Sequence, residues 1–164
     1  MYMRSLFAAA AISLVSILAH AQDADTAASS MFSPEGVSAA QVAEILQSEG
    51  YRAKLDEDSQ GDPMIRSKMS GFNVQIFFYQ CNEDVLCEDI QFHVGFDLDD
   101  GMTAEDVEAW NRQKRFAKIY RDDEDDPYLE IDLQLVPGGT PELVKGYIAT
   151  TDIMVALFAD HIGF

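Results

Sequence analysis

Apolar residues occupy every second position in several segments of this chain. In residues 129–135, leucine and isoleucine alternate with Glu130, Asp132 and Gln134, and residues 90–98 alternate in the same way. Successive side chains of an extended strand point to opposite sides, so each segment has one apolar and one polar face. A sheet built from such strands needs a second layer over its apolar face. The other alternating segments are residues 51–55 and 72–78.

Three segments have helical periodicity, and each begins at a residue suited to the start of a helix. Ser38 and Gln41 have the spacing of a capping box, and Gly50 is suited to end that helix in a left-handed conformation. Thr103 can cap a second helix. Pro141 stands at the first position of a third helix, which continues to the end of the chain.

The order of these elements predicts the fold class. It is helix, four strands, helix, two strands, helix, or α-β-β-β-β-α-β-β-α. Short turns between consecutive strands favour antiparallel pairing, with the helices on one face of the sheet. We therefore predict an α+β fold with an antiparallel sheet of about six strands. The expected strands cover residues 51–56, 64–69, 72–78, 90–98, 116–121 and 128–136.

The first 21 residues have the pattern of a secretory signal peptide. Arg4 precedes an apolar run from Leu6 to Leu18, and Ala19-His20-Ala21 fits the small-x-small cleavage pattern. A membrane anchor is the alternative, but this run is shorter than the roughly 20 apolar residues of a spanning helix. We expect cleavage near Ala21-Gln22, a periplasmic or secreted product and no stable membrane insertion afterwards. The expected organisation is a signal peptide at 1–21, a flexible leader at 22–36 and a domain at 37–164.

The chain is strongly acidic, with 29 Asp and Glu residues against 11 Lys and Arg residues and a net charge of −18. Removal of residues 1–21 would take away one basic residue, Arg4, and leave a net charge of −19. This charge repels the phosphates of nucleic acids and of anionic lipids. Nucleic acid is therefore excluded as a partner, whereas basic proteins, cations and neutral surfaces remain. Alternatively, the charge serves only solubility.

Cys81 and Cys87 are the only cysteines of the chain. In an oxidising compartment, two cysteines this close in sequence are expected to form a disulfide. A redox-active pair is one alternative, but the spacing differs from Cys-x-x-Cys, and the neighbouring Glu83 and Glu88 disfavour a reactive thiolate. Free thiols are the other alternative.

Two acidic segments and two histidines are candidates for metal binding. Asp56–Gly61 begins like a calcium loop, but position twelve is Ser67 rather than Glu, which favours a hairpin turn. Asp122–Asp126 carries five carboxylates and is interpreted as a solvated turn, with weak Ca²⁺ binding as the alternative. His93 and His161 lack further zinc ligands nearby in sequence. We expect no metal site and no cofactor.

Five segments, taken in their order and spacing, indicate a family. They are Ile45–Tyr51, Gly61–Ile65, Phe77–Cys81, Trp110–Phe116 and Leu129–Asp132. Together they resemble the YbjN family, described as bacterial sensory transduction regulators, over nearly the whole chain that follows residue 36. The resemblance implies a fold similar to type III secretion chaperones, which are small α+β domains, often dimeric, that bind segments of partner proteins. It implies no catalytic residues, because the family has no established active site.

A basic cluster on the second predicted helix is the candidate partner surface. The surface consists of Trp110 and the basic side chains of Arg112, Lys114, Arg115 and Lys118. Alternatively, Trp110 packs in the core and the basic side chains pair within the chain with the acidic turn at 122–126. Contact between the basic cluster and the acidic turn of a second copy would give a homodimer that high salt dissociates.

The sequence contains no nucleophile elbow, phosphate-binding glycine loop or zinc-protease motif. We therefore predict a non-enzymatic, exported binding or regulatory module of the YbjN type whose protein partner is unknown. It would bind a protein segment on its sheet or along an exposed edge. The alternative is a periplasmic enzyme or a weak cation-binding protein, because a site assembled in space leaves no local motif.

Overall fold

The computed structural model describes residues 31–164, in which six strands and three helices follow one another in the predicted order. The predicted α+β fold class is confirmed. The predicted signal peptide and most of the predicted leader lie outside the described residues. Within residues 31–164, no helix has the length and hydropathy needed to cross a bilayer. The elements are α2 (Ala39–Ser48), β1 (Lys54–Glu57), β2 (Pro63–Met69), β3 (Phe72–Cys81), β4 (Cys87–Gly95), α3 (Ala104–Gln113), β5 (Lys118–Arg121), β6 (Pro127–Gln134) and α4 (Pro141–Ile162).

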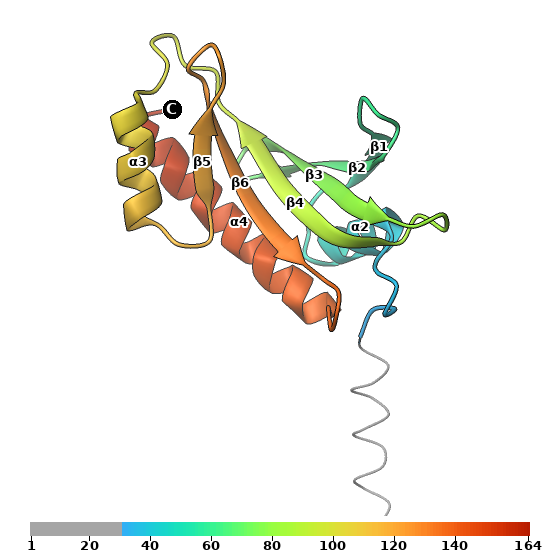
Figure 1. Ribbon diagram of the computed structural model, residues 1–164. Helices are drawn as coiled ribbons and strands as arrows, with labels where there is room; N and C mark the ends of the chain where they lie inside the picture. Colours follow the sequence, from blue (N-terminus) through green and yellow to red (C-terminus); the bar gives the residue numbers. More distant parts are fainter. Residues whose placement is uncertain (1–30) are drawn as a thin grey trace, which may run out of the picture. The chain divides into compact units, whose positions relative to one another are not determined.

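All six strands belong to one antiparallel sheet, in the order β1-β2-β3-β4-β6-β5 (Figure 1). The edge strands are therefore β1 and β5, and the central strand β4 pairs with β3 and β6. β6 is longer than β5, and only residues 127–130 of β6 pair with β5. Among the described residues, the second half of β6 has no strand beside it on that side.

Helices α2 and α4 cover one face of the sheet, and α3 packs beside β5 (Figure 1). Ser38 caps α2 and forms the predicted capping box with Gln41. Thr103 and Thr140 cap α3 and α4, because each hydroxyl accepts a hydrogen bond from a backbone N–H of the first turn. The three predicted helix starts are therefore confirmed.

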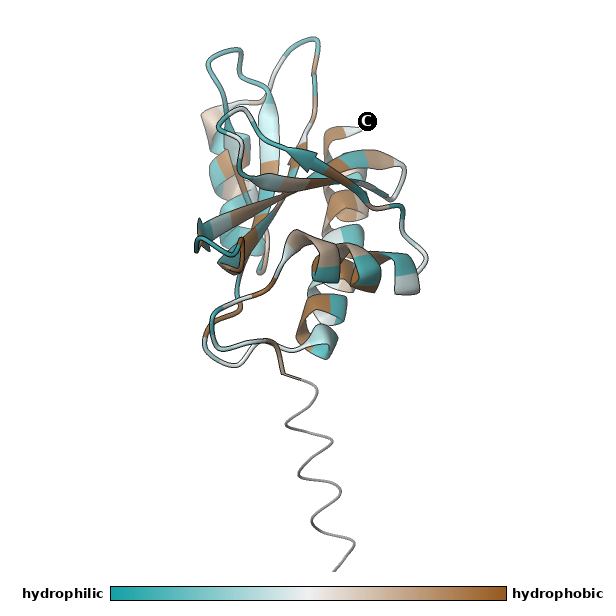
Figure 2. Ribbon diagram, turned by 90° about the vertical axis from the view of Figure 1, so that its right-hand side faces the viewer, coloured by the Kyte–Doolittle hydropathy of each residue, from teal (hydrophilic) through white to brown (hydrophobic). Residues whose placement is uncertain are grey.

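The apolar face predicted from the alternation is the buried face of the sheet. Phe92 of β4 and Ile131 of β6 are paired in the sheet and at most 1% exposed. Phe158 of α4 packs against the rings of Phe96 and Trp110, with centroids 5.1 and 4.9 Å away. Burial of one such side chain stabilises the fold by about 2 kcal/mol. Figure 2 shows the same division, with brown, apolar segments on the strands and on α4 and hydrophilic, teal turns.

Two strands begin later than the alternation predicts. The predicted strand 51–56 is reduced to β1, because the Tyr51 N–H donates a hydrogen bond to the Leu46 carbonyl and so belongs to the end of α2. The predicted strand 116–121 is reduced to β5, because Phe116 has a φ of 74°, which an extended strand does not allow.

Residues 31–36, which the sequence places in the flexible leader, contact the folded domain. The Phe32 N–H donates a hydrogen bond to the Gly139 carbonyl at 2.9 Å, and Val37 exchanges two backbone hydrogen bonds with Cys87. At Gly36 an added Cβ would lie 2.4 Å from the Cys87 carbonyl oxygen, so only glycine fits there. Within the described residues, the segment 31–36 is therefore attached to the domain that the sequence places from residue 37.

Cys81 and Cys87 form the predicted disulfide. They are paired directly across β3 and β4, next to the turn that joins these two strands. The loop that they close is short, so the expected stabilisation from loop closure is about 2 kcal/mol. Because Val37 is hydrogen-bonded to Cys87, the disulfide also lies where the chain enters the domain.

Three hairpin turns have the same geometry, and an aspartate or asparagine side chain holds each one. In the β1–β2 turn, Asp58 Oδ1 accepts hydrogen bonds from the N–H groups of Gln60 and Asp62. Asn82 and Asp122 accept from the residues two and four positions later in the β3–β4 and β5–β6 turns. The segment that begins like a calcium loop is thus a hairpin turn, as predicted.

The fourth residue of each of these turns has a positive φ. The angles are 89° at Gly61, 59° at Val85 and 65° at Asp125. A left-handed conformation costs an ordinary residue roughly 1–2 kcal/mol, and it is least favourable for a β-branched side chain. Val85 is therefore the strained member of the set.

We predict that Val85→Asn raises the free energy of unfolding by about 1 kcal/mol, because asparagine tolerates the left-handed conformation. Urea denaturation of the two proteins measures this difference. The control is Glu83→Asn, in the same turn at a residue without positive φ, which should change stability by less than about 0.5 kcal/mol. A Val85→Asn protein that is no more stable than the wild type would contradict the prediction.

Candidate functional site on the open sheet face

The face of the sheet opposite α2 and α4 is uncovered within residues 31–164 (Figure 1). Its side chains come from the polar positions of the alternating strands, and the register brings them together across β2, β3, β4, β6 and β5. We call this surface the open face. It comprises Arg66, Gln75, Phe77, Tyr79, Asp89, Gln91, His93, Lys118, Tyr120, Tyr128, Glu130 and Asp132.

A row of rings crosses four strands of the open face. The centroids of Phe77 and His93 are 5.5 Å apart, those of His93 and Tyr128 5.1 Å, and those of Tyr120 and Tyr128 5.4 Å. Tyr128 is paired with Gly95, where an added Cβ would lie 2.7 Å from the tyrosine ring. The glycine therefore makes room for this ring against the sheet. We call these four rings the aromatic row.

Glu130 is a largely enclosed acidic group of the open face, with a side chain that is 11% exposed. One carboxylate oxygen lies 3.3 Å from His93 Nδ1, and the other lies 3.1 Å from Lys118 Nζ. All three side chains meet because Glu130 is paired with His93 on one side and with Lys118 on the other. The register of the sheet thus assembles this cluster from three strands.

A polar network continues from Lys118 across the sheet. Lys118 Nζ also contacts Asp132 Oδ2 at 3.2 Å, and Gln91 Nε2 donates to Asp132 Oδ1 at 2.6 Å. The Tyr79 hydroxyl donates to Gln91 Oε1 at 3.2 Å. The chain of contacts from His93 to Tyr79 therefore spans β3, β4, β6 and β5, and it holds the polar side chains of the open face in one arrangement.

Burial and the carboxylate of Glu130 raise the pKa of Tyr120 to about 12. Burial also raises the pKa of Tyr79 and of Tyr128, and nearby carboxylates add to the shift. The hydrogen bond to Glu130 raises the pKa of Lys118. At neutral pH the open face therefore presents neutral phenols and a charged ammonium group, all of which are hydrogen-bond donors.

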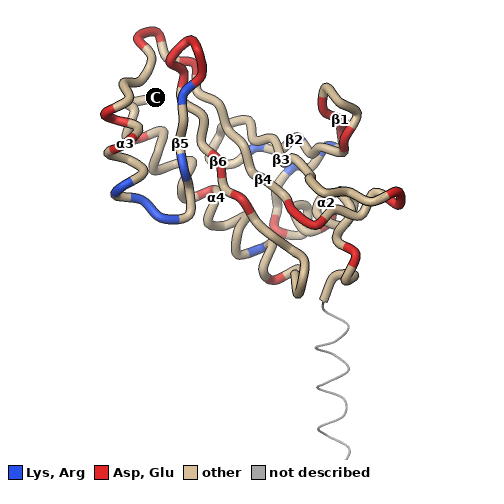
Figure 3. Tube along the Cα trace, in the orientation of Figure 1, with Lys and Arg blue, Asp and Glu red and all other residues tan. Residues whose placement is uncertain are grey.

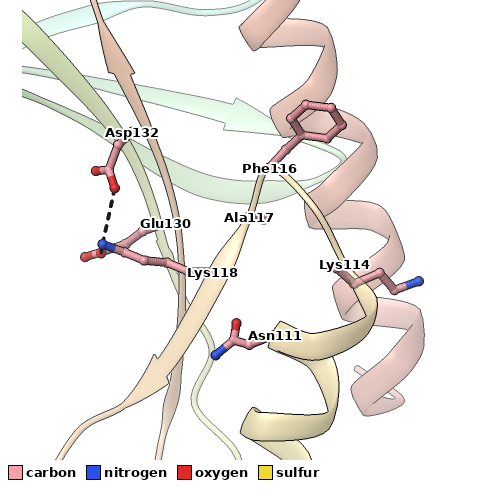
Figure 4. A pocket seen from close by; sticks show the side chains of 7 residues that line it. All are labelled: Asn111, Lys114, Phe116, Ala117, Lys118, Glu130 and Asp132. Atoms are coloured by element: carbon pink, nitrogen blue, oxygen red, sulfur yellow. Dashed lines mark hydrogen bonds and ion pairs between the residues drawn. The ribbon is translucent and has the colours of Figure 1, made fainter.

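A hollow of about 360 Å³ lies at one end of the open face, where β5 has not yet begun and the edge of β6 is uncovered (Figure 4). Lys118, Glu130 and Asp132 form its polar wall, and Figure 4 shows the ion pair between Lys118 and Asp132. Asn111 and Lys114, from the end of α3, lie on the other side. The hollow thus joins the open face to the predicted basic cluster.

Asn111 closes the outer edge of β5. Its side-chain amide donates to the Ile119 carbonyl and accepts from the Ile119 N–H, both at 2.9 Å. Ile119 stands opposite Leu129 of β6, but its backbone N–H and carbonyl both bond to Asn111, so they point away from the sheet. The amide of one helical residue therefore takes the place of a neighbouring strand at this edge.

Trp110 of the predicted partner surface is 1% exposed and packs in the core, as the alternative interpretation expected. Arg112, Lys114 and Arg115 follow it at the end of α3, where Figure 3 shows Lys and Arg gathered at one end of β5. The acidic turn 122–126 lies at the other end of β5. A partner can therefore contact the basic side chains directly, whereas Trp110 is buried. One of the basic side chains packs on the indole, with Lys114 Nζ 5.2 Å from the ring centroid.

The basic side chains do not pair with the acidic turn as one alternative proposed. Arg112 contacts Glu108 within α3, and Arg121 is the basic residue that pairs with the turn, through Asp125. Asp122 uses its carboxylate within the turn, as described above. No group of three or more potential metal ligands occurs within residues 31–164.

A family model matches the part of the chain that builds the sheet and its helices. It is the model of YbjN, with the description "Putative bacterial sensory transduction regulator", and it matches residues 38–164. The chain belongs to the YbjN family. This confirms the resemblance seen in the sequence, and the description is that of a regulator rather than of an enzyme. A search of curated proteins finds no match.

Sequence reasoning missed the cluster at Glu130. It placed His93 on the polar face of one strand and Glu130 and Asp132 on the polar face of another, and it assigned no role to either set. The alternation gives the face on which a residue lies, but the contact between these strands depends on the register of β4 with β6. One signal for this site was available in the sequence. Aromatic rings, those of Phe77, His93 and Tyr128, stand at positions of the strands where the alternation predicts polar side chains.

We predict that Asn111→Leu lowers the free energy of unfolding by about 1–3 kcal/mol, because it leaves the Ile119 N–H and carbonyl without partners. Urea denaturation measures the loss, and faster hydrogen exchange of the Ile119 amide locates it. Gln113→Leu, at an exposed position of the same helix, is the matched control and should have little effect. Equal stability of the Asn111→Leu protein and its control would show that the amide does not close this edge.

We predict that Glu130→Gln lowers the pKa of Tyr120, because it removes the carboxylate that opposes ionisation of the phenol. An absorbance titration of the phenolates measures the shift. Between pH 10.0, the unfolded value, and about 12, the unfolded tyrosine loses its proton while the folded one keeps it, so stability falls as pH rises. Tyr120→Phe should remove this part of the pH dependence. Asp132→Asn is the control and should leave Tyr120 largely unchanged.

Proposed function

We propose that this YbjN-family protein is an exported, non-enzymatic regulator that binds an extended segment of a partner protein on the open face. The observation that carries the proposal is the uncovered face of the sheet, where the aromatic row runs beside a carboxylate-rich network. Helices cover the other face, so this is the sheet surface left for a partner.

The aromatic row supplies the apolar part of such a site. Aromatic side chains offer a large contact area at low cost in conformational entropy, and they are common in the centres of protein interfaces. Contacts to neighbouring strands hold the four rings in place before a partner arrives. A segment that lies across the row would therefore bury apolar side chains against it.

The charge of the open face favours a basic segment. Asp89, Glu130 and Asp132 provide three carboxylates, and Lys118 is the ammonium group placed among them. The other cation of the open face, Arg66, is paired with Asp56 of β1. A Lys or Arg side chain of a partner would compensate the excess negative charge, and the net charge of −18 would speed its association. Arg112, Lys114 and Arg115 at the end of the face would then bind acidic residues of the same partner.

A binding role fits the paired state of the ionisable groups better than catalysis does. Glu130, Asp132 and Lys118 contact one another at distances of ion pairs and hydrogen bonds. A general base or a nucleophile needs an unshared pair directed at a substrate. The charged Lys118 has no unshared pair, and the carboxylates of Glu130 and Asp132 both contact it. The network therefore serves to hold the surface in shape.

Two features support export. The Cys81–Cys87 disulfide is of the kind that persists in oxidising compartments. The apolar run after Arg4 and the cleavage pattern at Ala19-His20-Ala21 fit a signal peptide. Both agree with a regulator that acts in the periplasm or outside the cell.

An NMR titration with two synthetic peptides of equal length tests the proposal. One peptide alternates Lys with Val, and the other alternates Glu with Val. We expect the basic peptide to shift the amide signals of β3, β4, β5 and β6, and the acidic peptide to leave them unchanged, because the open face carries excess negative charge.

Asp132→Asn should weaken the binding of the basic peptide roughly tenfold, because it removes one of the three carboxylates. The matched control is Glu44→Gln, an exposed residue on α2, which should leave the affinity unchanged. Signals of the open face that respond to neither peptide, or that respond equally to both, would refute the proposed site.

A further inference from the structure

The side of α4 that faces away from the sheet is exposed and carries no charge over several turns. Ile153 is 60% exposed, Leu157 44% and Leu143 38%. Gly146, Ala149 and Ala156 complete this face at helical spacing. We call these six residues the α4 stripe. Charged residues make up 24% of the chain, so an uncharged exposed surface of this length stands out against the rest of the molecule.

The ionisable residues of α4 in this region are held at the margins of the stripe. Lys145 Nζ lies 3.3 Å from a carboxylate oxygen of Glu49 on α2. Asp152 accepts a hydrogen bond from the Ser70 hydroxyl at 2.9 Å, in the turn between β2 and β3. These contacts turn both charges away from the stripe, so its uncharged character is built into the fold.

We propose that the α4 stripe is the interface of a homodimer, in which α4 of a second copy packs antiparallel to it about a two-fold axis near Ile153. A two-fold axis brings the same surface of both copies together, so the surface must be complementary to itself. An antiparallel arrangement about Ile153 meets this requirement in size and in charge.

The residue sizes on the two sides of Ile153 are complementary. The part of the stripe just before Ile153 is small, with Gly146 and Ala149, and apart from the helix itself no atom lies within 4 Å of the space where a Cβ of Gly146 would lie. The half after Ile153 carries Leu157. Ala149 and Leu157 lie at equal distances from Ile153, about 6 Å along the helix. In the antiparallel pair, each leucine therefore packs over the small residues of the other copy.

The charges beside the stripe also permit this arrangement. Asp160 lies about 10 Å after Ile153 along the helix. Lys145 is held by Glu49 of its own chain at the margin of the stripe. Each copy carries a net charge of −18, and an uncharged centre lets two such chains approach without placing carboxylates opposite each other.

This dimer leaves the open face free, because α4 lies on the opposite face of the sheet. Its salt dependence differs from that of a dimer held by the basic cluster and the acidic turn. Salt screens the repulsion between the two acidic copies, so an apolar interface should tighten between low salt and about 0.5 M. An interface of opposite charges should weaken over the same range.

A disulfide-crosslinking experiment tests the proposal. Ile153→Cys places a thiol next to the two-fold axis, and the native cysteines are already paired with each other. Under mild oxidation we expect most of this protein to become a crosslinked dimer on a non-reducing gel. The control is Leu55→Cys on β1, where the native side chain has a similar exposure of 53%. Equal crosslinking of the two variants would overturn the proposal.

Sedimentation velocity of the purified protein provides the second measurement. We expect a dimer that tightens with salt, and Ile153→Glu should weaken it at least about 100-fold because two carboxylates then meet at the axis. Leu55→Glu should leave the dimer intact. A wild-type protein that remains monomeric at about 1 mM, or a dimer that salt dissociates, would overturn the α4 interface.

Discussion

The burial of one face of the sheet beneath α2 and α4 is the constraint on which the structure depends. Phe158 packs between Phe96 of the sheet side and Trp110 of α3, so a single aromatic contact region joins two helices to the strands. Because strands β2 to β6 contribute apolar side chains to this face, their polar side chains gather on the other one. The surface available to a partner is thus a consequence of how the core is filled.

Local patterns in the sequence were sufficient to predict this fold. The alternation at 90–98 and 129–135 identified the buried face correctly. Successive side chains of a strand point to opposite faces, so apolar residues at every second position all lie on one face, and that face is buried. Ser38, Thr103 and Thr140 cap helices because the hydroxyl of each satisfies a backbone N–H of its own first turn. Two strands were predicted to begin too early, at Tyr51 and Phe116. Both residues have apolar side chains, but a hydrogen bond to α2 at Tyr51 and a positive φ at Phe116 keep the chain from being extended there.

The candidate site could not be predicted in the same way. The role of Glu130 depends on its contacts with His93 on one neighbouring strand and Lys118 on the other. These residues are distant in sequence and meet only through the register of the sheet. Trp110 and Arg112 were grouped as one surface because they are close in sequence. The helix instead turns the indole into the core and the guanidinium outward, because residues two positions apart on a helix do not face the same way.

The position of α3 has a consequence for any molecule that meets its basic end. Two consecutive residues hold this short helix: the indole of Trp110 is fixed among the rings of α4, and the amide of Asn111 is fixed to the backbone of β5. A helix held at two such points can neither roll nor tilt without breaking one of them. The backbone that carries its cationic side chains is therefore held in place, so less ordering entropy remains to be lost when a complex forms.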